Sequence, residues 1–198
     1  MRVLIKKSIL YISLITNILV FSNNKMDLIV SSKNTKTLSI SLTEINANEK
    51  VLIKNYTGKI IFSENIENDT HYHKSFNFDT LPLGLYLVEN ISDKHIRSQT
   101  LLVSKNRINL IPNTEKNYTC PVIKISSKDL SIKVKNLHNT STHISIHNNE
   151  GVLLHETETF TDNLIEGNYD ISNVKTNTKL KITTVIDGYQ FIDYVRTL

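Results

Sequence analysis

A single β pattern occurs twice in this chain, and this duplication constrains the fold more than any other feature of the sequence. Residues 51–64 and 144–157 each contain alternating apolar residues, a turn that ends in Gly, and a second apolar run. A similar alternation precedes each copy, at residues 38–42 and 130–134. A Leu-x-x-Gly-x-Tyr motif follows each copy, as Leu81, Gly84 and Tyr86 and as Leu164, Gly167 and Tyr169. Two copies of one supersecondary pattern indicate two copies of one β module.

Most of the chain alternates between apolar and polar residues with a period of two, which is typical of antiparallel strands with one buried face. In the first module we predict strands at residues 27–31, 37–43, 50–55, 59–65, 72–78, 84–91 and 95–104. In the second module we predict strands at residues 122–126, 129–135, 142–148, 152–157, 167–172, 179–186 and 190–195. Seven short strands per module, separated by turn residues, indicate an all-β chain of two antiparallel β-sandwiches.

Turn residues support this strand pairing. Gly58 and Gly151 stand where a hairpin turn requires a positive φ, and Asp187-Gly188 is a typical two-residue hairpin turn. The tyrosines that follow Gly84 and Gly167 fit either of two roles. They form a tyrosine corner, in which the hydroxyl bonds back to a nearby loop, or they are ordinary half-buried strand residues.

The two modules are expected at residues 27–111 and 122–198, each of a normal size for a small β-sandwich. Residues 112–121 join them and are polar, with Pro112 and Pro121 at their ends. This composition predicts a short exposed linker.

Residues 1–22 are typical of a secretory signal peptide, because Arg2, Lys6 and Lys7 precede an apolar stretch that ends at Phe21. An uncleaved membrane anchor is the alternative, although the stretch is shorter than the ~20 residues that a spanning helix needs. We therefore predict a secreted or cell-envelope protein, in the periplasm or on the outer surface. Any contact with a membrane would be made by this segment, if it is not cleaved.

The basic balance of the chain comes mainly from the predicted signal peptide. The whole chain has a net charge of +4, but without that segment it has 20 Lys and Arg against 19 Asp and Glu. The remaining basic residues are scattered along alternating strands, whereas nucleic-acid binding requires a clustered basic patch. We therefore expect no nucleic-acid partner.

Cys120 is the one cysteine of the chain and lies in the predicted linker. In an exported protein it has no intramolecular partner for a disulfide. It is either an incidental linker residue or the site of an intermolecular disulfide. A catalytic role would require a positioned His and an electropositive pocket, and the sequence indicates neither.

Histidines are the only candidates for metal chemistry. His71 and His73 share one face of a predicted strand, as do His143 and His147. Zinc sites need three or four ligands, and none of the nearby residues has the spacing of a third. Glu64, Asp69 and His95 are merely nearby in the sequence. We predict no metal, although a metal-dependent hydrolase that uses these histidines remains an alternative.

Acidic clusters at Glu64, Glu67 and Asp69 and at Glu156 and Glu158 follow the two repeated hairpins. Paired catalytic carboxylates must face one cleft, whereas acids at loop tips are usually solvated. The sequence has no nucleophile elbow, zinc-protease motif, P-loop or EF-hand pattern. We therefore predict a non-catalytic protein with no catalytic, cofactor-binding or metal-binding residues and no cofactor.

The segment from Ile53 to Glu64, followed by Leu81-Pro82-Leu83-Gly84-Leu85-Tyr86, resembles a known module. It is similar to the C-terminal sorting domain of type IX secretion cargo in Bacteroidota and to related Ig-like secreted modules. The likeness covers residues 50–90 and, more weakly, residues 143–172. It implies that both sandwiches are Ig-like and that the chain is exported.

The second copy departs from the motif at Ile165, where the first copy has Pro82. The better copy is thus in the first module, whereas a sorting signal stands at the C-terminus. We predict an exported non-catalytic protein that serves binding, adhesion or envelope assembly, with an unknown protein or glycan partner at the cell surface. The alternative is a small type IX secretion cargo whose second module is a sorting domain.

Overall fold

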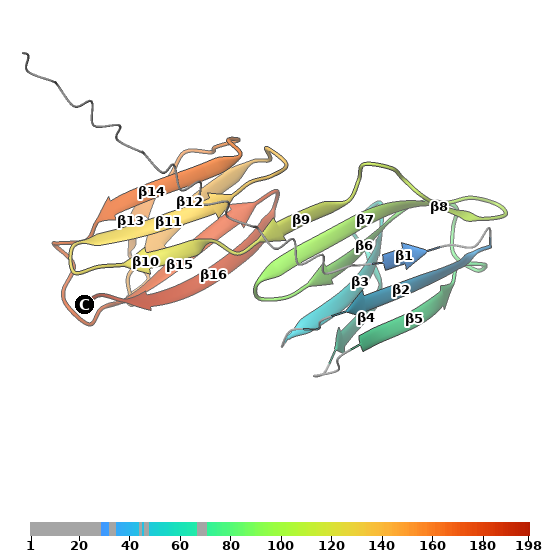
Figure 1. The fold of residues 1–198 in the computed structure, drawn as a ribbon, viewed down its shortest axis with the longest axis horizontal. Helices are drawn as coiled ribbons and strands as arrows, with labels where there is room; N and C mark the ends of the chain where they lie inside the picture. The colour runs from blue at the N-terminus through green and yellow to red at the C-terminus, as the bar shows by residue number, and fades with distance from the viewer. Residues whose placement is uncertain (1–28, 32–34, 44, 46–47, 67–70) are drawn as a thin grey trace, which may run out of the picture.

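The computed structural model describes residues 29–31, 35–43, 45, 48–66 and 71–198 (Figure 1). The predicted signal peptide at residues 1–22 lies outside the described residues, as do Glu67 and Asp69. Within the described ranges, no helix is long and apolar enough to cross a membrane.

The first module consists of two antiparallel sheets. One has the order β1-β2-β5, and the other has the order β4-β3-β6-β7-β8, with β9 also paired to β7. The strands are β1 (Ile29–Ser31), β2 (Thr37–Thr43), β3 (Glu49–Asn55), β4 (Ile60–Ile66), β5 (His71–Asn77), β6 (Gly84–Ile91), β7 (His95–Val103), β8 (Ile108–Leu110) and β9 (Lys116–Thr119).

The second module repeats this topology with sheets of order β10-β11-β14 and β13-β12-β15-β16. Its strands are β10 (Val122–Ile125), β11 (Asp129–Lys135), β12 (Thr142–His147), β13 (Leu153–Glu156), β14 (Leu164–Asp170), β15 (Lys179–Ile186) and β16 (Tyr189–Arg196). Seven strands have the same arrangement in both modules, and the first module adds β8 and β9 to its larger sheet. The repeated arrangement confirms the predicted pair of all-β, Ig-like sandwiches, with two strands more than predicted in the first. Figure 1 shows them end to end, with β9 leading from one to the other.

The period-two alternation determines which side chains form each core. Leu38, Ile40 and Leu42 of β2 are at most 2% exposed, and Leu130 and Ile132 of β11 are fully buried. The residues between them are less buried or exposed. Because burial of one such side chain contributes roughly 1.5–3 kcal/mol, these two strands anchor their cores.

The duplicated hairpin is formed by the same turn chemistry in both modules. Asn55 and Asn148 each accept backbone hydrogen bonds at the side-chain oxygen from residues two and four positions later, at 2.9–3.1 Å. Gly58 and Gly151 have φ values of 81° and 78°, which other residues rarely adopt. Asp187 and Gly188 also both have positive φ, as a two-residue hairpin turn requires.

The downstream motif, however, is not part of the repeat. Gly84 and Tyr86 lie in β6, which pairs with β3, whereas Gly167 and Tyr169 lie in β14, which pairs with β11. The Tyr86 hydroxyl donates to the carbonyl of Pro82 at 2.8 Å and forms the predicted tyrosine corner. Tyr169 instead packs its ring on His155, with 4.6 Å between the ring centroids. The similarity of the two motifs is therefore local in sequence and does not reflect equivalent strands.

Residues 112–121 do not form a simple exposed linker. They contain β9, which pairs with β7, and Tyr118 of β9 is only 1% exposed. The expectation of exposure is wrong here because Tyr118 fills the space between the modules. The division of the chain at residues 112–121 itself stays a prediction.

Candidate binding surfaces

The two modules are joined by a packed junction between β9, the end of β15 and the start of β16. Tyr118 and Ile96 belong to the same apolar cluster as the core of the second module. The Tyr118 ring contacts the rings of Tyr189 and His138 at centroid distances of 5.2 and 5.4 Å. The side chain that links the modules is thus part of a core and is not a flexible tether.

Polar contacts reinforce this junction. Asp187 accepts hydrogen bonds from Tyr118 and from Lys116, whose Nζ lies 2.7 Å from Oδ2. Burial alone would raise the pKa of Asp187, but the hydrogen bonds from Lys116 and Tyr118 outweigh it and lower the pKa. Burial and the neighbouring Asp187 both raise the pKa of Tyr118, so its hydroxyl stays protonated and donates.

Glu89 of the first module is 1% exposed and has a partner in each module. Its Oε2 lies 2.5 Å from Lys54 Nζ, and the Tyr189 hydroxyl donates to its Oε1 at 2.5 Å. A buried carboxylate is tolerated when it is paired and hydrogen-bonded in this way. These contacts hold the second module in a defined position on the first.

A buried histidine lies near the same end of the first module. His95 is 5% exposed, and its ring contacts Ser92 Oγ at 3.1 Å and Asn90 Oδ1 at 3.3 Å. Burial lowers the pKa of His95 to about 4, with a further decrease from Arg97 and an opposing increase from Glu49. The imidazole is therefore neutral at pH 7, and its 3.5 Å contact with Glu49 is not an ion pair there.

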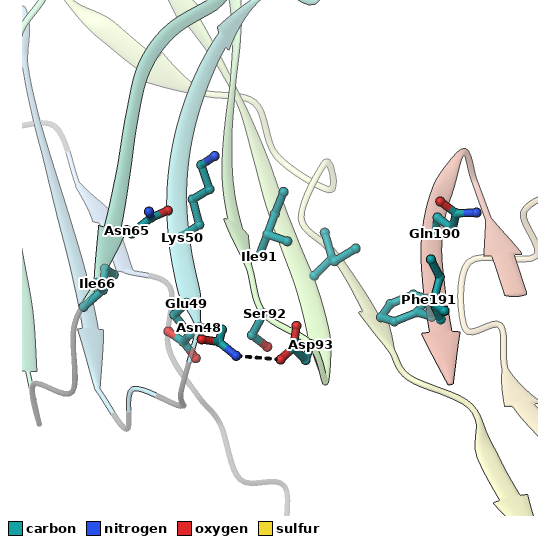
Figure 2. A pocket seen from close by; sticks show the side chains of 12 residues that line it. Asn48, Glu49, Lys50, Asn65, Ile66, Ile91, Ser92, Asp93, Gln190 and Phe191 are labelled. Atoms are coloured by element: carbon teal, nitrogen blue, oxygen red, sulfur yellow. Dashed lines mark hydrogen bonds between the residues drawn. The ribbon is translucent and has the colours of Figure 1, made fainter. Parts of the chain in front are cut away.

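A cleft of about 900 Å³ lies between this end of the first module and β16. In Figure 2, Gln190 and Phe191 stand opposite the turn that carries Ser92 and Asp93. Asn48 Nδ2 donates a hydrogen bond to Asp93 Oδ2 at 3.0 Å, and both residues line the cleft (Figure 2). The lining offers hydrogen-bonding groups, but Phe191 is only 4% exposed and so presents little aromatic surface to a ligand.

The edge of the first module at β4 and β5 is closed by side chains that connect the two sheets. Phe62 of β4 packs edge-on against Phe76 of β5, with centroids 4.7 Å apart. Glu64 accepts hydrogen bonds from the Tyr72 hydroxyl at 2.8 Å and from Lys74 at 2.9 Å. These five residues are called the closed edge below.

The corresponding edge of the second module, at β13 and β14, is open. All four residues of β13 are exposed, and the edge presents large apolar side chains to solvent. These are Val152 (52% exposed), Leu153 (47%), Leu154 (43%), Phe160 (36%) and Leu164 (46%), called the open edge below. The contact between His155 and Tyr169 places β13 next to β14, so the residues of both strands belong to one side of the module.

The open edge lies in the most acidic part of the chain. Residues 136–174 contain six Asp and Glu and no Lys or Arg, although the whole chain has a net charge of +4. Glu166 is neutralised by Lys133 of β11, and Glu156 contacts His143 at 2.9 Å. Glu150, Glu158 and Asp162 make no ion pair among the described residues. Lys135 of β11 is the Cα partner of Leu164, so two lysines of the neighbouring strand, Lys133 and Lys135, stand against the six acids of this segment. The acids outnumber these lysines along the open edge.

The candidate metal ligands are not brought together. His71 and His73 lie on β5 of the first module, where His73 Nδ1 contacts Ser41 Oγ at 2.7 Å. His143 and His147 lie on β12 of the second module. In the described part of the chain, no group of three or more His, Cys, Asp or Glu could hold a metal ion.

Cys120 lies at the start of the second module and packs against its core. Burial, and then the nearby Asp193, raise the pKa of its thiol. A raised pKa leaves little thiolate at neutral pH, which is the form that reacts. The environment of Cys120 thus favours a structural role over the alternative of an intermolecular disulfide.

The open edge was missed by the sequence reasoning. The strand at residues 152–157 was predicted, and Glu156 and Glu158 were interpreted as solvated acids. Two signals in the sequence point to the surface: the adjacent apolar run Val152-Leu153-Leu154, and the lack of any Lys or Arg across residues 136–174. A core can bury the apolar residues on only one face of an edge strand, so a continuous apolar run in such a strand leaves some of them exposed.

Several solved structures are weakly similar to this chain. They include a biofilm associated protein BSP domain, at 13% identity over 85% of this chain and 29% of the other, with a TM-score of 0.31. Two others are the FN1–FN3 domains of chicken CNTN1 (13% identity, 85% and 65% coverage, TM-score 0.33) and a two-domain fibronectin type III segment of chicken tenascin (10% identity, 86% and 98%, TM-score 0.29). This chain thus spans less than a third of the first structure's length. No curated protein matches the sequence.

A family model does match part of the chain. The model of the secretion system C-terminal sorting domain matches residues 32–104, from just before β2 to the end of β7. This range includes the tyrosine corner at Tyr86 and the first copy of the duplicated hairpin. The resemblance inferred from Leu81-Pro82-x-Gly84-x-Tyr86 is confirmed, and it lies in the first module.

Proposed function

We propose that this chain is an exported, non-catalytic protein that binds a protein or glycan partner at the cell surface. The observation that carries the proposal is the open edge, where five large apolar residues are 36–52% exposed on one side of the second module. Large apolar side chains gathered on an exposed sheet edge often mark a site of contact with another molecule. The junction supports this role, because a module held by buried contacts presents its edge in a fixed direction.

Export is supported by two independent observations. The first module matches the secretion system C-terminal sorting domain, and residues 1–22 have the pattern of a signal peptide. The absence of a described metal cluster and of known catalytic motifs is compatible with a binding role. Function depends on particular sites and not on the fold, and the surface at the open edge is suited to contact with a partner.

A second candidate function is secretion through a sorting module, which the family match favours. The match lies at residues 32–104, so we propose that the first module, and not the second, would carry such a signal. The hypothesis that residues 122–198 are the sorting domain has no comparable support.

Export is tested by producing the full chain with an epitope tag in a bacterium of the Bacteroidota. We expect the tag in the medium or on the outer surface, where added protease removes it from intact cells. A cytoplasmic reporter in the same cells is the control for lysis. A tag that stays entirely with the cytoplasmic reporter contradicts the proposal.

The assignment of the sorting role is tested by removing residues 121–198. We expect the shortened chain to be exported as the full chain is, provided that it resists protease as a folded domain does. Loss of export from a folded first module would assign the signal to the second module and contradict our assignment.

A further inference from the structure

We infer that the open edge binds an extended segment of a partner protein in which Lys or Arg alternate with apolar residues. This inference rests on the proposed function and names the kind of partner for the same surface.

The backbone of the open edge has unused hydrogen-bonding capacity. β13 pairs with β12 on one side and is the last strand of its sheet, and β14 is the last strand of the other sheet. On an antiparallel edge strand, alternate N–H and C=O groups point away from the sheet. Such a row pairs readily with an added strand, which is a common mode of peptide recognition.

The first module blocks the same edge and the second does not. Asn55 and Asn148 begin equivalent turns, so Glu64 corresponds to Thr157 and Ile61 corresponds to Leu154. Ile40 and Ile132 are equivalent core residues that pair with Lys74 and Gly167, so these two also correspond. The inward-pointing pair of Glu64 and Lys74 is thus replaced by Thr157 and Gly167 in the second module.

That replacement removes a recognised protection of sheet edges. Inward-pointing charges and edge lysines prevent strands of other molecules from adding to an edge, because pairing would desolvate the charge. Without them, Leu153 and Leu154 of β13, which are 47% and 43% exposed, are available for apolar contacts with an added strand. The ladder between β12 and β13 shifts register at Leu154, as that between β3 and β4 does at Ile61, so this irregularity does not distinguish the two edges. The backbone supplies affinity, and these side chains supply specificity.

Charge complementarity determines which segment fits. Glu150, Glu158 and Asp162 lie in the segments that precede and follow β13, and residues 136–174 contain six Asp and Glu and no Lys or Arg. On the neighbouring strand β11, Lys133 is taken up by Glu166 and Lys135 lies opposite Leu164, so acids remain in excess at this edge. An acidic strand would be repelled by this field, whereas a basic one would be attracted and would associate faster. The favoured occupant is therefore an extended segment in which basic and apolar residues alternate, so that one face is charged and the other is apolar.

The test uses the full chain and a fluorescent probe peptide of about eight residues that alternates Lys and Val. We expect saturable binding by fluorescence anisotropy, and weaker binding as the salt concentration is raised from about 50 to about 500 mM. Two further peptides are controls: one alternates Glu and Val, and one carries a central Pro that removes a backbone donor. Equal binding of all three peptides, or no binding of the Lys-Val peptide, overturns the inference.

Variants locate the binding. Leu154→Lys puts a charge on the edge and is expected to weaken the Lys-Val peptide by about tenfold or more. Ile61→Lys, at the equivalent position of the first module, is the matched control and should leave binding unchanged. The double change Glu158→Lys with Asp162→Lys should weaken binding and reduce its salt dependence. Circular dichroism of each variant checks that it is folded, and equal loss with Ile61→Lys overturns the assignment.

A second copy of this chain is the competing occupant. Sedimentation of the chain with and without Leu154→Lys decides between them, since a dimer that this change abolishes would assign the edge to self-association and overturn the inference. The result is separate from the test of export. A chain that reaches the cell surface but does not bind the basic peptide contradicts only the inference about the partner.

Discussion

The two modules share the order of seven strands but differ in the side chains at one edge of the sandwich. In the first module, Phe62 and Glu64 of β4 contact Phe76, Tyr72 and Lys74 of β5, and these side chains close the gap between the sheets. In the second module, β13 and β14 share one aromatic contact, between His155 and Tyr169, and leave large apolar side chains in solvent.

The difference lies in a few side chains and not in topology. The aromatic pair is kept, since Phe62 and Phe76 correspond to His155 and Tyr169, but the charged pair is lost. Gly167 makes room for Tyr169, because a Cβ atom at Gly167 would lie 2.4 Å from the Tyr169 hydroxyl. A fold that was duplicated can thus keep one copy as a closed scaffold while the other copy exposes an edge for contact.

The opposite edge shows the same asymmetry. In the first module, β7 is covered along its length by β8 and β9. In the second module, the described pairing of β16 is with β15 alone, and Ile192 and Tyr194 of β16 are 45% and 57% exposed. The first module therefore has the more completely paired sheet on this side. On the β4 side, Ile60 and Ile61 are also 51% and 38% exposed, so the difference between the modules there lies in the Glu64–Lys74 pair and its contacts.

The largest effect is expected where the closed edge is opened by removing its aromatic pair. Phe76→Ala should destabilise the chain by about 3 kcal/mol, because it removes partly buried apolar surface and the ring contact with Phe62. Tyr169→Ala, at the equivalent place, should cost less, about 2 kcal/mol, because its partner His155 is itself exposed. Urea unfolding followed by circular dichroism measures both.

A larger loss for Tyr169→Ala than for Phe76→Ala would contradict the comparison. It would mean that the edge of the second module is as tightly packed as that of the first. Ser75→Ala, on the outward face of β5, is a control that should change stability by less than about 0.5 kcal/mol.

Acid should destabilise the fold through a buried histidine of the first module that the second module lacks. His95 binds a proton in the unfolded chain below pH 6.5 but in the folded chain only near pH 4, its lowered pKa. Because the unfolded state binds the extra proton, stability falls as the pH is lowered through this window, by up to about 3 kcal/mol. The equivalent position in the second module is Tyr189, which does not titrate there.

The measurement is the free energy of unfolding at pH 7 and at pH 4.5 for the wild type and for His95→Gln. Gln keeps hydrogen-bonding capacity but has no titrating group, so the variant should lose less stability on acidification. Carboxylates far from His95 contribute equally in both proteins and cancel, whereas Glu49, 3.5 Å from His95, is common to both chains but changes neighbour. An identical pH dependence in the two proteins would show that His95 is already protonated in the folded state.

Much of this architecture follows from sequence pattern alone. Strands such as β2, β6 and β15 were predicted with the bounds that the structure shows, because alternating residues with one buried face leave little freedom of register. The Gly turns and the tyrosine corner at Tyr86 were predicted because each requires a specific residue. The hairpin at Asp187 was also confirmed for this reason.

What the sequence did not predict depends on contacts between distant residues. β9 was placed in an exposed linker, since nothing local shows that Tyr118 will be buried between two modules. The motif around Gly167 was matched to that around Gly84, although pairing with β11 places it in a different strand. The closed and open edges likewise depend on which side chains meet across two sheets, which a periodicity of two does not specify.

The smallest effect should come from the charges alone. Glu64→Gln should cost about 1 kcal/mol, because it weakens a partly exposed ion pair with Lys74 and the hydrogen bond from Tyr72. The hydrogen bonds from Lys74 and Tyr72 lower the pKa of Glu64, against a smaller opposing effect of burial. The contribution is therefore present above the usual pKa of 4.5 and is lost as the pH falls through the lowered value. Glu156→Gln at the open edge should cost less than about 0.5 kcal/mol at pH 8, because its contact with His143 is on the exposed surface. Thermal unfolding at pH 8 and pH 3 compares the two variants, and equal losses at pH 8 would show that the charged pair does not distinguish a closed edge from an open one.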